Sequence, residues 1–90
     1  MKKITMFMLE KCPYCIAAKS WMDELMSENE TYRKLEIEFI DERKNPEIAN
    51  KHDYFYVPAY FSEGKKLHEG AASLEIVKGV FDAVAAQPEK

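Results

Sequence analysis

Two cysteines separated by two residues carry the most specific chemistry of this chain. The tetrapeptide Cys12-Pro13-Tyr14-Cys15 follows a run of β-forming residues, Ile4 to Met8, and precedes apolar residues at helical spacing. The first N–H groups of a helix have no partner within it, and the helix dipole places partial positive charge there, so a thiolate at Cys12 is stabilised. Cys15, one turn later, returns to the same face within reach of a disulfide with Cys12. The spacing therefore predicts a reversible dithiol–disulfide pair in which Cys12 is the nucleophile.

Two other uses of the cysteines fit less well. A closed zinc site needs four ligands, and His52 and His68 lie far from the pair in the sequence and lack the usual paired spacing. A static structural disulfide is rare in the intracellular compartment that we expect for this chain. We therefore expect neither a metal nor another cofactor.

The composition fits one small domain spanning residues 1–90. Apolar and aromatic residues make up 47% of the 90 residues, enough for one core and too few for two domains. The net charge of −3, with both signs interspersed, disfavours nucleic-acid binding, which requires a basic face. The apolar run near the N-terminus ends at Leu9, too early for a secretion signal, and no segment approaches the ~20 apolar residues that cross a bilayer. We expect a cytoplasmic protein that binds neither nucleic acid nor membranes.

The hydrophobic pattern predicts seven elements in the order strand, helix, strand, helix, strand, strand, helix. The expected ranges are strand 4–8, helix 13–27, strand 35–40, a short helix from 46 to near 52, strand 59–62, strand 66–69, and a helix that Ser73 caps and Pro88 ends. The first two strands should be parallel through a right-handed crossover, and the last two should form an antiparallel hairpin. The predicted fold class is α/β, with a mixed four-stranded sheet flanked by three helices that are distributed over its two faces.

Several other side chains have a structural interpretation at this stage. Ile16 is expected in the buried stripe of the first helix, Asn45 as a helix cap, and His52 on the surface. The charged residues 41–44 are expected to form a solvated turn. Of the three aromatic residues 54–56, at least one is expected to be exposed near the thiols, where it would favour apolar peptide segments.

The motifs together resemble those of a glutaredoxin with a thioredoxin-like fold. They are Cys12-Pro13-Tyr14-Cys15 after the first strand, Val57-Pro58 before the third, and Gly70 before the last helix. The resemblance covers nearly the whole chain and implies a cis peptide bond between Val57 and Pro58. It also implies that the proline loop packs against the dithiol, and that the backbone of Val57 pairs with an extended substrate like an added strand.

The chain departs from glutaredoxins at two anchors for glutathione. Typical members have a lysine three residues before the first cysteine, where this chain has Leu9, and acidic residues after a Gly-Gly pair, where it has Gly70-Ala71-Ala72-Ser73. Lys11 is the candidate to replace the missing lysine, and backbone N–H groups at the start of the last helix can receive a carboxylate. Glutathione binding is therefore expected to be weakened. The expected substrate-binding residues are Lys11, Pro13, Tyr14, Val57, Pro58, Gly70, Ala71 and Ala72.

Thioredoxins are similar in fold but match less well. Thioredoxins share a Trp-Cys-Gly-Pro-Cys motif and a buried acidic residue six positions before the first cysteine. This chain has Met6 at the position of the acidic residue.

The sequence predicts an enzyme that reduces protein or small-molecule disulfides with electrons from an unidentified reductase or thiol donor. The alternatives are a thioredoxin-type reductase with little glutathione dependence, a redox sensor, and a module that binds an iron–sulfur cluster through Cys12.

Overall fold

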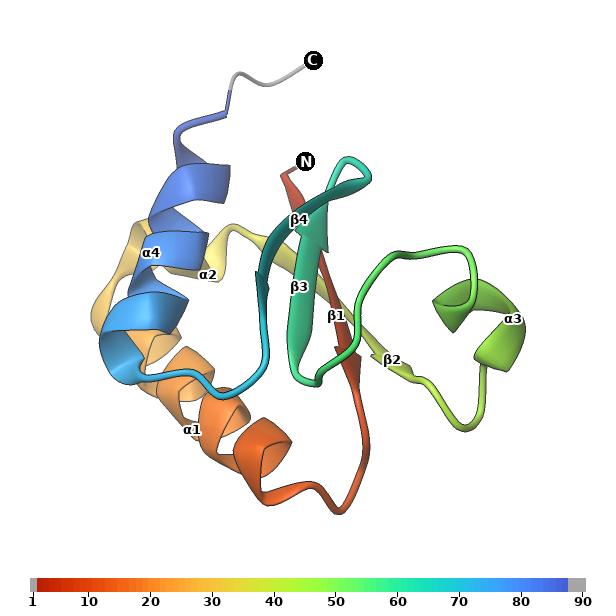
Figure 1. The fold of residues 1–90 in the computed structure, drawn as a ribbon. Coiled ribbons are helices and arrows are strands. Elements are labelled where there is room, and N and C mark those ends of the chain that lie inside the picture. The colour runs from red at the N-terminus through yellow and green to blue at the C-terminus, as the bar shows by residue number, and fades with distance from the viewer. Residues whose placement is uncertain (1, 88–90) are drawn as a thin grey trace.

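The computed structural model describes residues 2–87. Within these residues the chain forms a four-stranded sheet in the order β2-β1-β3-β4 and four helices (Figure 1). The elements are β1 (Lys3–Met8), α1 (Pro13–Glu28), α2 (Glu30–Arg33), β2 (Glu36–Asp41), α3 (Pro46–Ala49), β3 (Ala59–Ser62), β4 (Lys65–Glu69) and α4 (Leu74–Ala85). The predicted α/β class and mixed four-stranded sheet are confirmed.

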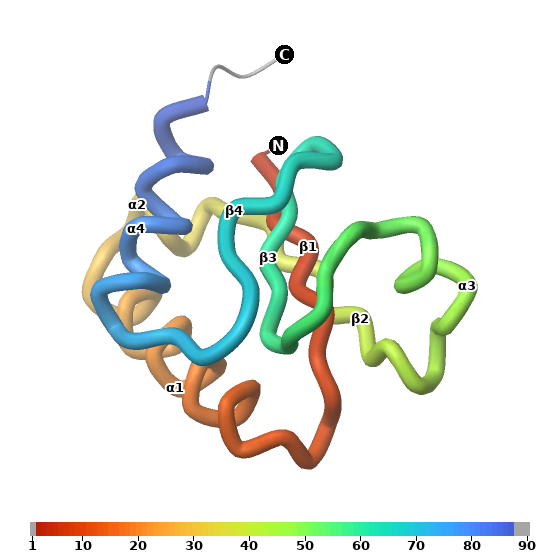
Figure 2. Tube along the Cα trace, viewed as in Figure 1, coloured from red at the N-terminus to blue at the C-terminus, as the bar shows by residue number. Residues whose placement is uncertain are grey.

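The sheet topology brings the loops that follow β1 and β2 to the same end of the sheet. β1 pairs in parallel with β2 and antiparallel with β3, while β3 and β4 form the predicted hairpin. The register places Met8, the last residue of β1, opposite Asp41, the last residue of β2. The connections that follow these strands therefore start side by side. Figure 2 shows the β1–α1 connection turning at the end of the molecule opposite the start of β1 and the end of α4.

Helices cover both faces of the sheet, as predicted. The larger core lies between the sheet and α1, α2 and α4, around the fully buried Ile4, Met6 and Tyr60. The smaller core, on the other face, contains Phe7 and Phe61 and is covered by residues of α3 and the segment after it. Figure 1 shows α3 on the opposite side of the sheet from the other three helices. Among the described residues, no helix is both long and apolar enough to cross a membrane.

The short helix α2 is absent from the sequence prediction, which gave three helices instead of four. Asn29 ends α1 by donating its backbone N–H to the Leu25 carbonyl at 3.0 Å, and its side chain accepts the Thr31 N–H at 2.9 Å to begin α2. Tyr32 then packs on Phe81 of α4, with ring centroids 5.3 Å apart. A single helical turn contains too few residues to show a periodic pattern, so the prediction missed it.

Three further predictions are wrong in detail. Ile16 is 56% exposed, because the buried stripe of α1 runs through Cys15, Ala18, Met22 and Leu25. Asn45 precedes α3, but its side-chain amide donates to the Asp41 carbonyl at 3.2 Å and makes no side-chain capping bond. His52 is half-buried, with its ring 4.6 Å from that of Phe7 between centroids. The predicted stop at Pro88 lies outside the described residues.

Candidate active site

Cys12 occupies the N-cap position of α1, as predicted. Pro13 begins the helix, and the Cys12 carbonyl accepts the Ile16 N–H at 3.0 Å. The Cys12 N–H donates to the Leu9 carbonyl at 3.2 Å, which fixes the tight connection from β1. Its side chain makes no capping hydrogen bond within residues 2–87, and the residue is partly exposed. The Cys12 sulfur is therefore accessible to an incoming substrate.

Cys15 lies beneath Cys12 and is buried, with an exposed fraction of 1%. Burial raises the pKa of the Cys15 thiol to about 11, and the hydrogen bond to the Cys12 sulfur raises it as well. The Leu9 backbone N–H and the Lys19 charge oppose this increase in pKa. Both cysteines are free thiols. At neutral pH Cys15 is therefore a protonated thiol held against the more accessible Cys12.

The core beneath Cys15 is made of apolar and aromatic groups. Met6 and Tyr60 are fully buried, and the Tyr60 hydroxyl donates to the Met22 sulfur at 3.4 Å. Burial raises the pKa of Tyr60, and the charge of a Cys15 thiolate raises it further. Tyr60 is therefore a neutral neighbour of Cys15. Met6 stands where the sequence comparison with thioredoxins places an acidic residue.

The predicted cis peptide bond between Val57 and Pro58 is confirmed. The Pro58 carbonyl accepts the Gly70 N–H at 2.9 Å, so the end of β4 holds the proline loop in place. Gly70 has a φ of +89°, a conformation that favours glycine. Val57 and Cys12 are both partly buried against the larger core. Within the described residues, the backbone N–H and carbonyl of Val57 have no hydrogen-bond partner, which leaves both free to pair with an extended segment.

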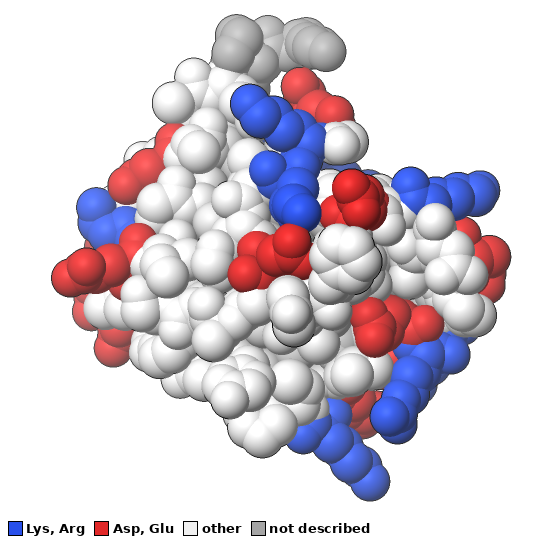
Figure 3. Space-filling model, viewed as in Figure 1, with Lys and Arg blue, Asp and Glu red and all other residues white. Residues whose placement is uncertain are grey.

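Exposed aromatic side chains surround this part of the molecule. Tyr14 is 60% exposed, Phe55 82% and Tyr56 67%. Figure 3 shows uncharged side chains over the lower middle of this face, where Figure 1 places the start of α1 and the loop before β3. The prediction that at least one aromatic residue of segment 54–56 is exposed is confirmed. Phe55 and Tyr56, which are adjacent, are both exposed because the segment is irregular and does not alternate like a strand.

The other predicted binding residues lie in two connections, one before α1 and one before α4. Lys11 is exposed and lines a pocket with Cys12 and Leu9. Ala71 is exposed and Ala72 half-buried in the connection from Gly70 to α4. The Ser73 hydroxyl accepts the Ile76 N–H at 3.1 Å and so caps α4, as predicted. Within residues 2–87, no three His, Cys, Asp or Glu side chains are grouped to hold a metal ion.

Glu69 is a residue of this region that the sequence analysis missed. Its Oε2 accepts the backbone N–H groups of Phe55 at 2.7 Å and Tyr56 at 3.2 Å, and its Oε1 forms an ion pair with Lys66 at 2.7 Å. The Lys66 hydrogen bond, followed by that from Phe55, lowers the pKa of Glu69 to about 2. Glu69 therefore anchors the aromatic loop that leads to Pro58. No sequence signal marks it, because the residues it contacts lie 13 and 14 positions away.

Replacing Glu69 with glutamine is expected to lower the midpoint of thermal unfolding at pH 7. The pKa of Glu69 is lowered by folding from 4.5 to about 2, so the stabilisation is complete above pH 4.5 and is lost as the pH falls toward 2. The difference in unfolding midpoint between the wild type and Glu69→Gln should therefore narrow as the pH falls from 4.5 to about 2. Thermal unfolding at pH 7, 4 and 2 measures it, with Glu24→Gln on the exposed face of α1 as the matched control. A difference that stays constant over this range would contradict the assignment.

Comparison with known proteins identifies the fold. No protein-family model matches the chain, and a search of curated proteins finds no match. Among solved structures, the oxidised thioredoxin from Plasmodium falciparum superposes with a TM-score of 0.71 at 21% sequence identity, covering 93% of this chain and 81% of that one. The thioredoxin Deadhead from Drosophila melanogaster gives a TM-score of 0.67 at 15% identity, covering 91% and 79%. A mutant thioredoxin from Halobacterium salinarum gives 0.67 at 15% identity, covering 97% and 77%. The chain therefore has a thioredoxin-like fold.

Proposed function

We propose that this protein is a dithiol–disulfide oxidoreductase that reduces disulfides in extended peptide segments of proteins. The observation that carries the proposal is the pair formed by the accessible Cys12 at the N-terminus of α1 and the buried Cys15 hydrogen-bonded to it. The presence of thioredoxins among the structures of the same fold also supports it.

The reaction proceeds in two exchange steps. The Cys12 thiolate attacks one sulfur of the substrate disulfide, so that a mixed disulfide forms and the other substrate sulfur leaves as a thiolate that takes up a proton. The Cys15 thiol then loses its proton to solvent, and its sulfur attacks that of Cys12. The second substrate sulfur leaves as a thiolate that takes up a proton, and a Cys12–Cys15 disulfide remains. The substrate gains two electrons and two protons, and a reductase or thiol donor later returns them to the protein.

The proline loop supplies the substrate-binding surface in this proposal. The unpaired backbone groups of Val57 pair with the backbone of the substrate, while Tyr14, Phe55 and Tyr56 contact its apolar side chains. The two missing charged anchors, at Leu9 and Ala72, are the reason for choosing peptide segments over glutathione as the principal substrate. A glutathione-dependent glutaredoxin is the second candidate, because the Cys-Pro-Tyr-Cys motif resembles that family.

A comparison of electron donors tests this function. We expect the protein to reduce an insulin-type disulfide with a small dithiol or a thioredoxin-reductase system as donor, and to reduce glutathione mixed disulfides poorly. Efficient turnover with glutathione and glutathione reductase, together with poor insulin reduction, would instead favour the second candidate. Failure with every donor would refute a dithiol oxidoreductase.

A further inference from the structure

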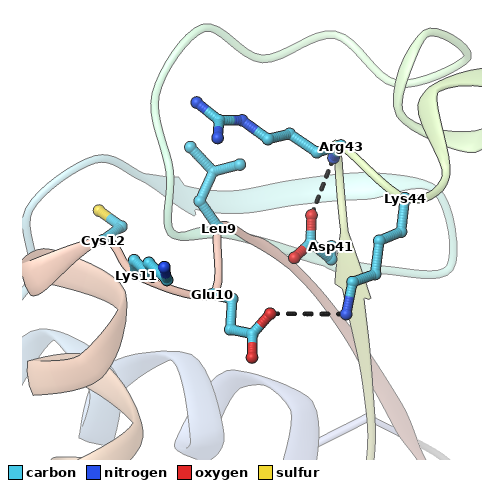
Figure 4. A pocket seen from close by; sticks show the side chains of 7 residues that line it. All are labelled: Leu9, Glu10, Lys11, Cys12, Asp41, Arg43 and Lys44. Atoms are coloured by element: carbon cyan, nitrogen blue, oxygen red, sulfur yellow. Dashed lines mark hydrogen bonds and ion pairs between the residues drawn. The ribbon is translucent and has the colours of Figure 1, made fainter.

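A pocket of about 420 Å³ opens beside Cys12, on the side formed by the two loops that follow β1 and β2. Its lining residues are Leu9, Glu10, Lys11, Cys12, Asp41, Arg43 and Lys44. The pocket includes a face of Cys12, so a group that occupies it lies next to the disulfide under attack. Figure 4 shows the Arg43 side chain extending over Leu9 toward the side on which the Cys12 sulfur lies.

The pocket is locally cationic in an acidic chain. Three of its side chains are basic and two are acidic, which leaves a formal charge of +1, whereas the whole chain carries −3. Both carboxylates are already engaged. Glu10 Oε2 lies 3.5 Å from Lys44 Nζ, and Asp41 Oδ1 accepts the Arg43 backbone N–H at 2.9 Å. Among the described residues, the Arg43 guanidinium and the Lys11 ammonium have no ion-pair partner.

The backbone that carries Arg43 is held firmly against the end of β1. The Glu42 N–H donates to the Met8 carbonyl at 3.0 Å. The Asp41 carbonyl accepts N–H groups from Lys44 at 3.1 Å and from Asn45 at 3.0 Å, as well as the Asn45 side-chain amide. Arg43 therefore projects from a fixed turn, although the sequence pattern suggested only a solvated connection.

We propose that Arg43, assisted by Lys11, binds an acidic side chain that lies near the disulfide of a protein substrate. The inference rests on the proposed function and names the substrate class that this site prefers. An arginine guanidinium binds a carboxylate through two parallel N–H···O bonds, whereas a lysine ammonium acts as a point charge. Arg43 is therefore the better of the two side chains for binding a carboxylate. Arg43 also lines a second pocket with Tyr54 and Phe55 of the aromatic loop before Pro58, so the ionic contact with the substrate lies beside an apolar one.

Matched peptide disulfides test this preference. Three peptides that differ only in having Glu, Gln or Lys two residues from the reactive cysteine are reduced with a small dithiol as donor. We expect kcat/KM for the Glu peptide to exceed that for the Gln peptide by about threefold to tenfold, the range for one or two partly exposed ion pairs, and the Lys peptide to be slowest. Added salt should reduce the preference.

The variant Arg43→Glu is expected to reverse the order of the Glu and Lys peptides while the Gln peptide changes little. Arg33→Glu is the control, since it makes the same charge change on the exposed surface of α2, outside the pocket. If Arg43→Glu and Arg33→Glu changed the peptide preference equally, the preference would depend only on the net charge of the protein. That result would overturn the inference. An unchanged preference in Arg43→Glu would also overturn it. In both cases continued turnover of the Gln peptide would leave the proposed function standing, whereas no turnover of any peptide would refute both.

Glutathione also carries carboxylates, so it is the alternative ligand for this pocket. Reduction of glutathione disulfide by the wild type and Arg43→Glu separates the two ligands. We expect Arg43→Glu to lower this rate by a smaller factor than it lowers the rate for the Glu peptide, while the order of the Glu and Lys peptides reverses. A loss confined to glutathione disulfide, with no change among the peptides, would overturn the assignment to a protein side chain.

Discussion

Replacing Cys12 with serine is expected to lower disulfide reduction by at least about a thousandfold, as for removal of an attacking nucleophile. Cys12 is the accessible sulfur of the pair, whereas Cys15 is buried and its pKa is raised to about 11. Cys15 therefore cannot take over the first step at neutral pH. Steady-state reduction of an insulin-type disulfide measures the loss.

The variant Cys15→Ser should behave differently, because it retains the nucleophile and loses only the second step. We expect it to attack a substrate disulfide once and to accumulate as a mixed disulfide, visible by mass spectrometry as a covalent adduct on Cys12. In the wild type, alkylation at neutral pH should label Cys12 before Cys15. Faster labelling of Cys15 would show that the division of roles is wrong.

The sequence predicts the elements around the thiols because each has a local signal. Pro13 at the first helical position and the run of β-forming residues before it mark the strand-to-helix junction, which sets Cys12 at the N-cap. Ser73 marks the start of α4 in the same way. The cis bond before Pro58 has no such signal, and only the resemblance to glutaredoxins implied it.

The missed features depend on contacts between distant segments. Glu69 reaches back to the loop at Phe55 and Tyr56, and Arg43 enters a pocket with Cys12 only because β1 and β2 are parallel neighbours whose ends align. His52 appeared to be a surface residue, but it packs on Phe7 and Phe61 from two strands of the sheet. Periodicity along the chain contains no information about these pairings, which form only when the sheet is assembled.

The double variant Leu9→Lys and Ala72→Asp is expected to gain activity on glutathione mixed disulfides. The two substitutions restore the charged anchors that resemblance to glutaredoxins implies for a carboxylate and for an amine of glutathione. Each ionic contact contributes about 1 kcal/mol when partly exposed, so the pair should raise kcat/KM by roughly tenfold to thirtyfold. Leu9 is half-buried and lines a pocket with Lys11 and Cys12, and Ala72 packs, like Cys12, against the larger core.

The matched control is the double variant Leu9→Gln and Ala72→Asn, which introduces side chains of similar size without charge. It should show little of the gain, and the charged variant should lose most of its advantage at high salt because the anchors are near the surface. Reduction of an insulin-type disulfide should change little in either variant, since Cys12, Cys15 and the proline loop are retained. A wild type that already saturates at low glutathione concentration, with no gain from the charged pair, would mean that Lys11 and the backbone at the start of α4 suffice to bind glutathione. The absent anchors would then be no obstacle, and a glutathione-dependent glutaredoxin would become the better assignment.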